Sequence, residues 1–316
     1  MFTKLRAHVT ALSFLALMAA SAAAQEQALA PQAAPQQVPP QSGAQQAPPV
    51  QVPAGFQLNP LQQAALDQVL TAWQTQSAKI ATFKCDFERL EYNLVFGPSR
   101  DIPLNRNKGE LSFGRPDKGS FRITEINTWK ETPPPPGQPA PAEKKGTWVP
   151  QPNAIGEHWM CDGKSVFEYR HNQKHLVERQ IPPQFQGQAI VDGPLPFLFG
   201  ADANKLKARY WMRLEQPPNQ EQIWLVALPK LQAQAADFRA VEVILDRQRL
   251  LPTHMQVHLP NGDRHVYTFN IASATINSPL QKLQTLIKLP RLPGGWKHIV
   301  EQMPVEQAAQ PGPAPR

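Results

Sequence analysis

Residues 83–96 read FKCDFERLEYNLVF, and this stretch decides the fold class. Phe83, Cys85 and Phe87 alternate with charged residues, which is the two-residue period of a β-strand with one buried face. Further along the stretch, the apolar residues continue in the opposite phase. A long strand with a β-bulge near Glu88–Arg89 is therefore predicted, because a bulge inserts one residue and exchanges the two faces.

Short alternating segments of the same kind follow along most of the chain. They lie at residues 108–114, 119–129, 166–169, 176–180, 210–214, 223–228, 241–245, 252–259 and 266–271. Asp162-Gly163 and Asn261-Gly262 are dipeptides typical of tight hairpin turns. No helical pattern separates consecutive strands as a parallel sheet requires, so the sequence predicts an antiparallel sheet with few helices.

Two segments are expected to be helical. Residues 61–77 carry apolar side chains at helical spacing after Asn59-Pro60, a good N-cap followed by proline in the first turn. Pro194–Gly200 is short and apolar on every side, so it must be covered. It either plugs the core or forms a lid over an apolar cavity lined by one sheet face.

Proline, 35 of 316 residues, gathers at both ends of the chain and in one internal run. The N-terminus combines Lys4 and Arg6 with an apolar stretch and Ala22-Ala23-Ala24, the pattern of a cleaved export signal. The expected organisation is a signal peptide at 1–24, a Pro/Gln-rich disordered spacer at 25–60, one domain at 61–302 with a Pro-rich loop insertion at 133–141, and a disordered tail at 303–316.

The net charge of +7 is spread along the chain without a basic run, so no nucleic-acid partner is expected. Weak attraction to an anionic membrane surface suits this charge better. The two cysteines, Cys85 and Cys161, leave two hypotheses open. They form one disulfide in an oxidising compartment, or they are two small buried core residues.

The motifs of common catalytic sites are absent from the sequence, among them G-x-S-x-G, H-E-x-x-H and G-x-G-x-x-G. His254 and His258 are four residues apart, but on a strand they share the polar outer face, which is not a metal-binding arrangement in itself. The sequence therefore predicts a protein that is not an enzyme and has no catalytic residues, no cofactor and no metal.

The order of motifs resembles the outer-membrane lipoprotein carrier family, the LolA/LolB-like proteins, over Leu61–Ile276. The resemblance rests on F-x-x-x-F-x-R at Phe83–Arg89, G-x-L-x-F-x-R-P at Gly109–Pro116, a D-G-K turn at Asp162–Lys164 and the apolar helix at Pro194–Phe199. Among such proteins it is similar to a planctomycete-type secreted branch. The Pro/Gln spacer, the Pro-rich insertion and the cysteines depart from the family pattern.

The resemblance implies a mainly β fold: an incomplete, strongly curved antiparallel half-barrel with an N-terminal helix and short lid helices on its concave side. Arg115 matches the arginine of the R-P motif, whose guanidinium would hold the lid shut by hydrogen bonds to carbonyls near the Pro194–Gly200 helix. The alternative is that Arg115 lies in water at the strand end and only its stem touches the core. The residues expected to contact lipid are Phe87, Leu111, Phe113, Phe121, Ile123, Phe167, Tyr169, Leu195, Phe197 and Leu198.

Two functions follow from this resemblance. The first is a soluble, monomeric periplasmic carrier whose partners are lipid acyl chains or lipoproteins, together with envelope membrane proteins. Burial of one methylene contributes about 0.8 kcal/mol, so apolar contacts alone can hold an acyl chain. The second is a regulator that does not transport: a lipid sensor or a protein-binding scaffold on the same fold.

Overall fold

The computed structural model describes residues 52–134, 144–183, 186, 197, 202–230, 232–278, 292 and 294–302. The predicted signal peptide, most of the spacer, the C-terminal tail and most of the Pro-rich insertion lie outside these residues. The chain divides into two compact units, Met1–Gln57 and Leu58–Arg316. In the first unit, the Phe56 amide donates to the Pro53 carbonyl at 3.0 Å. The helices and strands below belong to the second.

The first helix, α1 (Pro60–Ala78), begins as the sequence predicts. The Asn59 side chain accepts a hydrogen bond from the Gln62 amide at 2.9 Å, and the Gln62 side chain accepts one from the Asn59 amide at 3.0 Å. This reciprocal pair satisfies two donors that a helix start otherwise leaves unpaired. The helix buries one face through Leu66, Leu70, Trp73 and Ser77.

The remaining elements are mostly strands. In chain order they are β1 (Thr82–Tyr92), β2 (Asn105–Gly114), β3 (Lys118–Glu131), β4 (Gly146–Pro150), β5 (His158–Asp162), β6 (Ser165–Arg170), η1 (His171–Gln173), β7 (His175–Gln180), α3 (Ala203–Arg209), β8 (Tyr210–Glu215), β9 (Gln222–Pro229), α4 (Gln232–Asp237), β10 (Ala240–Asp246), β11 (Pro252–His258), β12 (Arg264–Phe269), β13 (Thr275–Ile276) and β14 (Lys297–Gln302).

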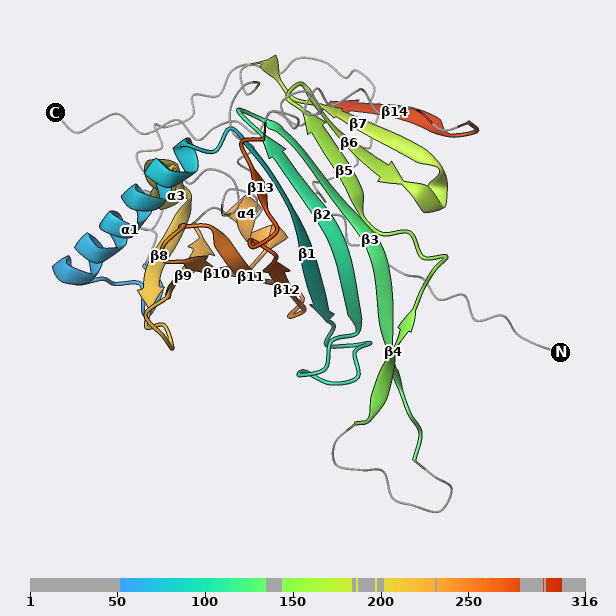
Figure 1. Cartoon of the computed structure of the whole chain (residues 1–316), viewed down its shortest axis with the longest axis horizontal. Coiled ribbons are helices and arrows are strands. Elements are labelled where there is room, and N and C mark those ends of the chain that lie inside the picture. The colour runs from blue at the N-terminus through green and yellow to red at the C-terminus, as the bar shows by residue number, and fades with distance from the viewer. Residues whose placement is uncertain are drawn as a thin grey trace, which may run out of the picture. The chain divides into compact units, whose positions relative to one another are not determined.

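The strands form one open, curved sheet in the order β14-β7-β6-β5-β3-β2-β1-β12-β11-β10-β9-β8, with β13 on β1 and β4 on β3 (Figure 1). Neighbouring strands are antiparallel except β14 and β7, which run parallel. The predicted fold class, a mainly β antiparallel sheet that does not close and that carries an N-terminal helix, is confirmed. The long connection required by a parallel pair is here the whole stretch from the end of β7 to the start of β14, which includes β8 to β13.

Strand β1 runs without a register shift against both β2 and β12. The bulge predicted near Glu88–Arg89 is therefore wrong. Arg89 stays on the buried face, where its guanidinium lies 2.6 Å from Glu91 and 2.7 Å from Glu157, so the strand needs no extra residue to turn this charge outward. The irregularity lies instead between β2 and β3, at Lys108 and Gly109.

The short helix α3 joins α1 at the β8 end of the sheet (Figure 1). Asp202 caps α3, because its carboxylate accepts hydrogen bonds from the Asn204 and Lys205 amides. The Lys207 ammonium lies 2.8 Å from the Asp67 carboxylate of α1, and this pair is well exposed to solvent. Such a pair contributes little to stability, so the two helices are held mainly by their buried side chains.

Candidate functional site

A continuous apolar face runs across β1, β2 and β3. The register places Phe83 beside Phe113 and Cys85 beside Leu111, and it then places Leu111 beside Phe121. Side chains that are directly opposite in an antiparallel pair lie on the same face. Five predicted lining residues meet here, all buried in the main core cluster: Phe87, Leu111, Phe113, Phe121 and Ile123.

A row of aromatic rings crosses this face from β5 to β12. The Trp159 and Phe121 rings stack with centroids 5.6 Å apart, and Phe121 stacks on Phe87 at 4.8 Å. Phe87 in turn lies 6.3 Å from Phe269. Gly109 lies opposite Phe87, and a Cβ at this glycine would overlap the Phe87 ring, which gives the first residue of the G-x-L-x-F-x-R-P motif its structural reason.

The C-terminal half of α1 covers one end of the apolar face and leaves a small hollow there, with a cavity volume of about 10 Å³. This is roughly the space of one water molecule and far below the range of about 300–1,000 Å³ that is usual for ligand pockets. An acyl chain therefore needs more room than the closed arrangement offers, and α1 is the element that borders the space. The lining residues are Trp73, Ser77, Ile80, Phe83, Phe113, Leu250, Leu251 and Pro252.

Arg115 fastens the end of α1 beside this hollow. Its Nε donates to the Ile80 carbonyl and its Nη2 to the Ser77 carbonyl, each at 2.8 Å. The last carbonyls of a helix have no partner within the helix, so they are natural acceptors for a guanidinium. The expectation that Arg115 reaches carbonyls near Pro194–Gly200 is thus corrected, because its hydrogen bonds go to the end of α1. The side chain is exposed but anchored.

Asn277 holds the same connection from the other side. Its side-chain oxygen accepts from the amides of Ala81 and Thr82, at 2.6 and 3.2 Å, and its side-chain nitrogen donates to the Lys79 carbonyl at 2.8 Å. Asn277 has φ +54°, a left-handed conformation that asparagine tolerates better than most residues. The turn between α1 and β1 is therefore held from both sides, and nothing in the sequence analysis singled out this asparagine.

Two predicted lining residues face the other way. The register pairs Phe121 with Trp159 and Trp159 with Glu168, so Glu168 shares the face of Phe121. Phe167 and Tyr169 therefore lie on the opposite face, and their expected place among the lining residues is wrong. The aromatic residues of β6 do not reveal by themselves which face of the hairpin they occupy, because that depends on the register with β5.

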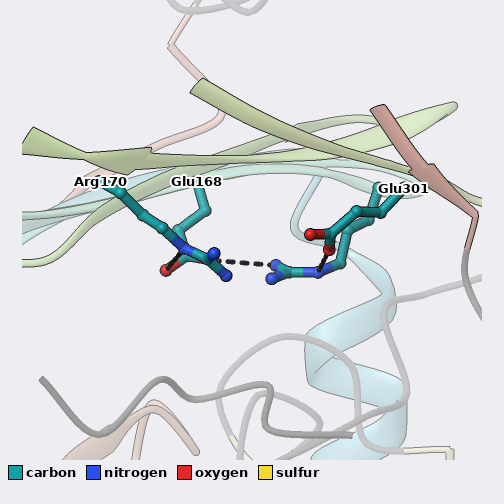
Figure 2. A network of polar contacts seen from close by, with 4 residues as sticks. Glu168, Arg170 and Glu301 are labelled. Atoms are coloured by element: carbon teal, nitrogen blue, oxygen red, sulfur yellow. Dashed lines mark hydrogen bonds and ion pairs between the residues drawn. The ribbon is translucent and has the colours of Figure 1, made fainter. Parts of the chain in front are cut away.

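On the side of Phe121, the outer strands carry an ionic network (Figure 2). Arg179 lies 3.0 Å from Glu168 and 3.0 Å from Glu301, and Arg170 lies 3.1 Å from Glu168. Burial works to raise the pKa of the Glu168 carboxyl, but the hydrogen bonds and charges of the two arginines outweigh it and lower that pKa. Beyond Trp159, the same face on β6, β7 and β14 therefore carries these charges beside apolar residues such as the buried Val177.

A second charged group lies at the far end of β1. Arg89 is only 6% exposed, and its guanidinium lies 5.8 Å from the Phe121 ring centre. Burial works to lower its pKa, but the nearby carboxylates of Glu91 and Glu157 outweigh it and raise that pKa well above the usual value. Asn107 also donates to Glu91, at 2.7 Å. Sequence reasoning missed this cluster, although Arg89 ends the F-x-x-x-F-x-R motif.

The other predicted lid residues are placed only in part. Leu195 and Leu198 lie outside the described residues. Phe197 is fully buried, and its ring lies 5.0 Å from Tyr210 of β8.

The two cysteines do not form a disulfide. Cys85 lies on β1 and Cys161 on β5, with β2 and β3 between them. Strands are about 4.8 Å apart, so the two Cα atoms are separated by roughly 14 Å, well beyond the reach of a disulfide. Both thiols are free and buried, and burial raises their pKa values to about 12 for Cys85 and about 11 for Cys161. The core-cysteine hypothesis is the correct one.

Within the described part of the chain, no three His, Cys, Asp or Glu side chains are grouped to hold a metal ion. His258 lies 2.7 Å from the Glu242 carboxylate on the sheet surface. None of the described helices has the length and apolar character needed to cross a bilayer.

No protein-family model matches the chain, and none of the curated proteins matches it significantly. Several solved structures, however, are similar to the chain. An uncharacterised conserved protein from Thermus thermophilus is 10% identical, with a TM-score of 0.37, over 74% of this chain and 98% of its own. A LolA superfamily protein from Nitrosomonas europaea is 8% identical, with a TM-score of 0.31, over 68% of this chain and 96% of the Nitrosomonas chain. LprF from Mycobacterium bovis is 10% identical, with a TM-score of 0.29, over 68% of this chain and 97% of LprF.

The LolA-like fold that the motifs indicate is thus represented among the solved structures similar to this chain.

Proposed function

We propose that the protein is a periplasmic carrier that holds the acyl chains of lipids or lipoproteins between α1 and the apolar face of β1, β2 and β3. The observation that carries this proposal is the hollow under α1, which continues a broad apolar face and is bordered by an element with few polar tethers. No catalytic group is needed for such binding, because acyl chains are recognised by burial alone.

The energetics suit a carrier. A chain of about 16 methylenes gains at most on the order of 13 kcal/mol by full burial, and the displacement of α1 offsets part of this gain. The tethers at Arg115 and Asn277 are hydrogen bonds to backbone groups of one short connection. Local opening of such an element costs less than unfolding, so uptake and release can occur without loss of the sheet.

The test is direct identification of cargo. Organic extracts of the natively purified protein are analysed by mass spectrometry, and the delipidated protein is titrated with a dansyl-labelled fatty acid. We expect one class of acylated molecule in the extract and saturable binding of the probe. A folded protein that carries no lipid and does not bind the probe would overturn the proposal.

A matched pair of variants places the binding site. Ser77→Trp fills the hollow from the buried face of α1, and Ala72→Trp adds the same side chain on the exposed face of that helix. We expect Ser77→Trp to weaken probe binding at least tenfold and Ala72→Trp to change it less than twofold. Thermal unfolding of both variants verifies that they remain folded. Equal binding by both would place the probe elsewhere.

A further inference from the structure

Three large apolar side chains project into solvent directly after β1. Leu94 is 49% exposed, Val95 78% and Phe96 75%. Single exposed apolar residues are common, but three in succession at the tip of a turn form a patch of the kind that marks an interaction site. We refer to Leu94, Val95 and Phe96 as the apolar tip.

The apolar tip is held in place by its own polar scaffold. The Asn93 side-chain oxygen accepts from the Val95 amide at 3.0 Å and from the Phe96 amide at 2.6 Å. The Leu94 amide donates to the Asp263 carboxylate at 2.8 Å, and the Asn93 side chain donates to the same carboxylate at 2.7 Å. These bonds hold the backbone of the turn in the conformation in which the three side chains are exposed.

Two arginines lie beside the tip. Arg100 is exposed, and Arg264 donates to the Arg100 carbonyl at 3.1 Å while its guanidinium lies 3.9 Å from the Tyr92 ring centre. Asp101 is exposed as well, whereas Asp263 is buried in the scaffold. The Glu242 carboxylate, which is bonded to His258, also lies within the field of Arg264. Arg100 and Arg264 are still suited to an anionic neighbour, because guanidinium binds phosphate well.

From this arrangement we propose that the apolar tip docks the protein on a phospholipid bilayer, with its side chains among the upper acyl chains and with Arg100 and Arg264 at the lipid phosphates. A bilayer fits better than a protein partner, because a stable protein interface buries about 1,200 Å² or more and three side chains on a projecting turn offer far less. Shallow insertion of a few apolar side chains beside cationic groups is typical of reversible membrane contact. The inference goes beyond the proposed function and holds whatever the cargo is.

The first experiment is vesicle flotation with the whole secreted chain and vesicles of phosphatidylethanolamine and phosphatidylglycerol. Val95→Ser/Phe96→Ser removes the two most exposed side chains, and Ile155→Ser, at another exposed apolar residue outside the tip, is the matched control. We expect the double variant to bind vesicles at least tenfold more weakly and the control to bind within twofold of the wild type. A wild type that does not float, or a double variant that floats as well as the wild type, would overturn the proposal.

The second experiment reads insertion directly and does not depend on a loss of binding. Cys85 and Cys161 are buried and their thiol pKa values are raised, so Phe96→Cys introduces the thiol that reacts with an environment-sensitive dye. Addition of vesicles should shift the emission of this dye to the blue and should leave the dye on Ile155→Cys unchanged. No shift at residue 96, or photo-crosslinking from residue 96 to a protein and not to lipid, would contradict bilayer docking.

Binding of the dansyl fatty acid in the absence of vesicles separates this proposal from the proposed function. The double variant should keep that binding, because the tip lies outside the residues that line the hollow.

Discussion

Arg89 is a charged side chain on an otherwise apolar strand face, and its two carboxylate partners make that position stable. A buried ion pair contributes modestly as a pair, but removal of one partner leaves uncompensated charge in a medium that solvates it poorly. Glu91 and Glu157 would be left in that state, because both lie within 2.7 Å of the guanidinium.

We predict that Arg89→Met lowers the free energy of unfolding by about 3 kcal/mol at neutral pH, measured by urea unfolding. The matched control is Arg106→Met, which breaks the more exposed pair with Glu88 and should cost about 1 kcal/mol or less. Equal losses in the two variants would show that Glu91 and Glu157 are well solvated without Arg89.

His158 gives the protein a sensitivity to acid. Its ring stacks on Tyr169 at 4.3 Å, and burial, helped by the charges of Arg122 and His171, lowers its pKa from 6.5 to about 4. The unfolded chain therefore binds more protons than the folded chain between these two values. The free energy of unfolding consequently falls as the pH is lowered from about 6.5 to about 4.

We predict that His158→Phe, which keeps a ring over Tyr169, reduces the acid-induced loss in the free energy of unfolding by about 2 kcal/mol. This value is smaller than the full pKa shift implies, because the site is partly exposed to solvent. Urea unfolding at a series of pH values measures it, with His175→Phe, outside the stack, as the control. If the free energy of unfolding fell with pH equally steeply in the wild type and in His158→Phe, His158 would not be the source of the acid sensitivity.

At the scale of elements, α1 is fixed at its C-terminal end by polar tethers and along its length by packing. Its last turn is bonded by Arg115, and the following connection is bonded by Asn277. Movement of this end would widen the hollow under Trp73, while the capping box at Asn59 keeps the other end helical.

We predict that Arg115→Leu keeps the fold but changes the rate of acyl-probe uptake or release about tenfold, measured by stopped-flow fluorescence. Two lost hydrogen bonds of about 0.7 kcal/mol each, a size suited to a largely exposed site, give this factor. Arg115→Lys keeps the charge but not the forked geometry, so its rate of probe uptake or release should lie between those of the wild type and Arg115→Leu. Unchanged kinetics in folded Arg115→Leu would assign α1 no role as a gate.

The sequence predicted elements better than it predicted the face to which some residues belong. The alternation at Phe83 to Phe87 and the cap at Asn59 are local signals, and both are confirmed. Phe167 was placed on the wrong face, because the face depends on the register with β5, which no local pattern encodes. Asn277 escaped notice for a similar reason: its partners lie almost 200 residues away in the sequence.

At the scale of the whole molecule, the boundary at Gln57 and Leu58 separates a unit without described helices or strands from the sheet unit. We predict that the chain shortened to begin at Gly55 melts within a few degrees of the chain that begins at Gln25, measured by calorimetry, because the spacer has almost no apolar side chains to bury. A large drop in melting temperature would mean that the spacer packs on the sheet.

The pairing of β1 with β12 has a consequence for how the chain reaches its native state. The sheet consists of two series of mostly local antiparallel neighbours, β1 to β7 and β8 to β12, and Phe87 meets Phe269 at the seam between them. The search for a partner so distant along the chain is slow, because the intervening loop must first lose its entropy. We therefore expect each series to acquire structure early and the seam to form late. The apolar face that crosses the seam is thus complete only at the final step of folding, so the ability to bind an acyl chain should appear with the slowest folding phase.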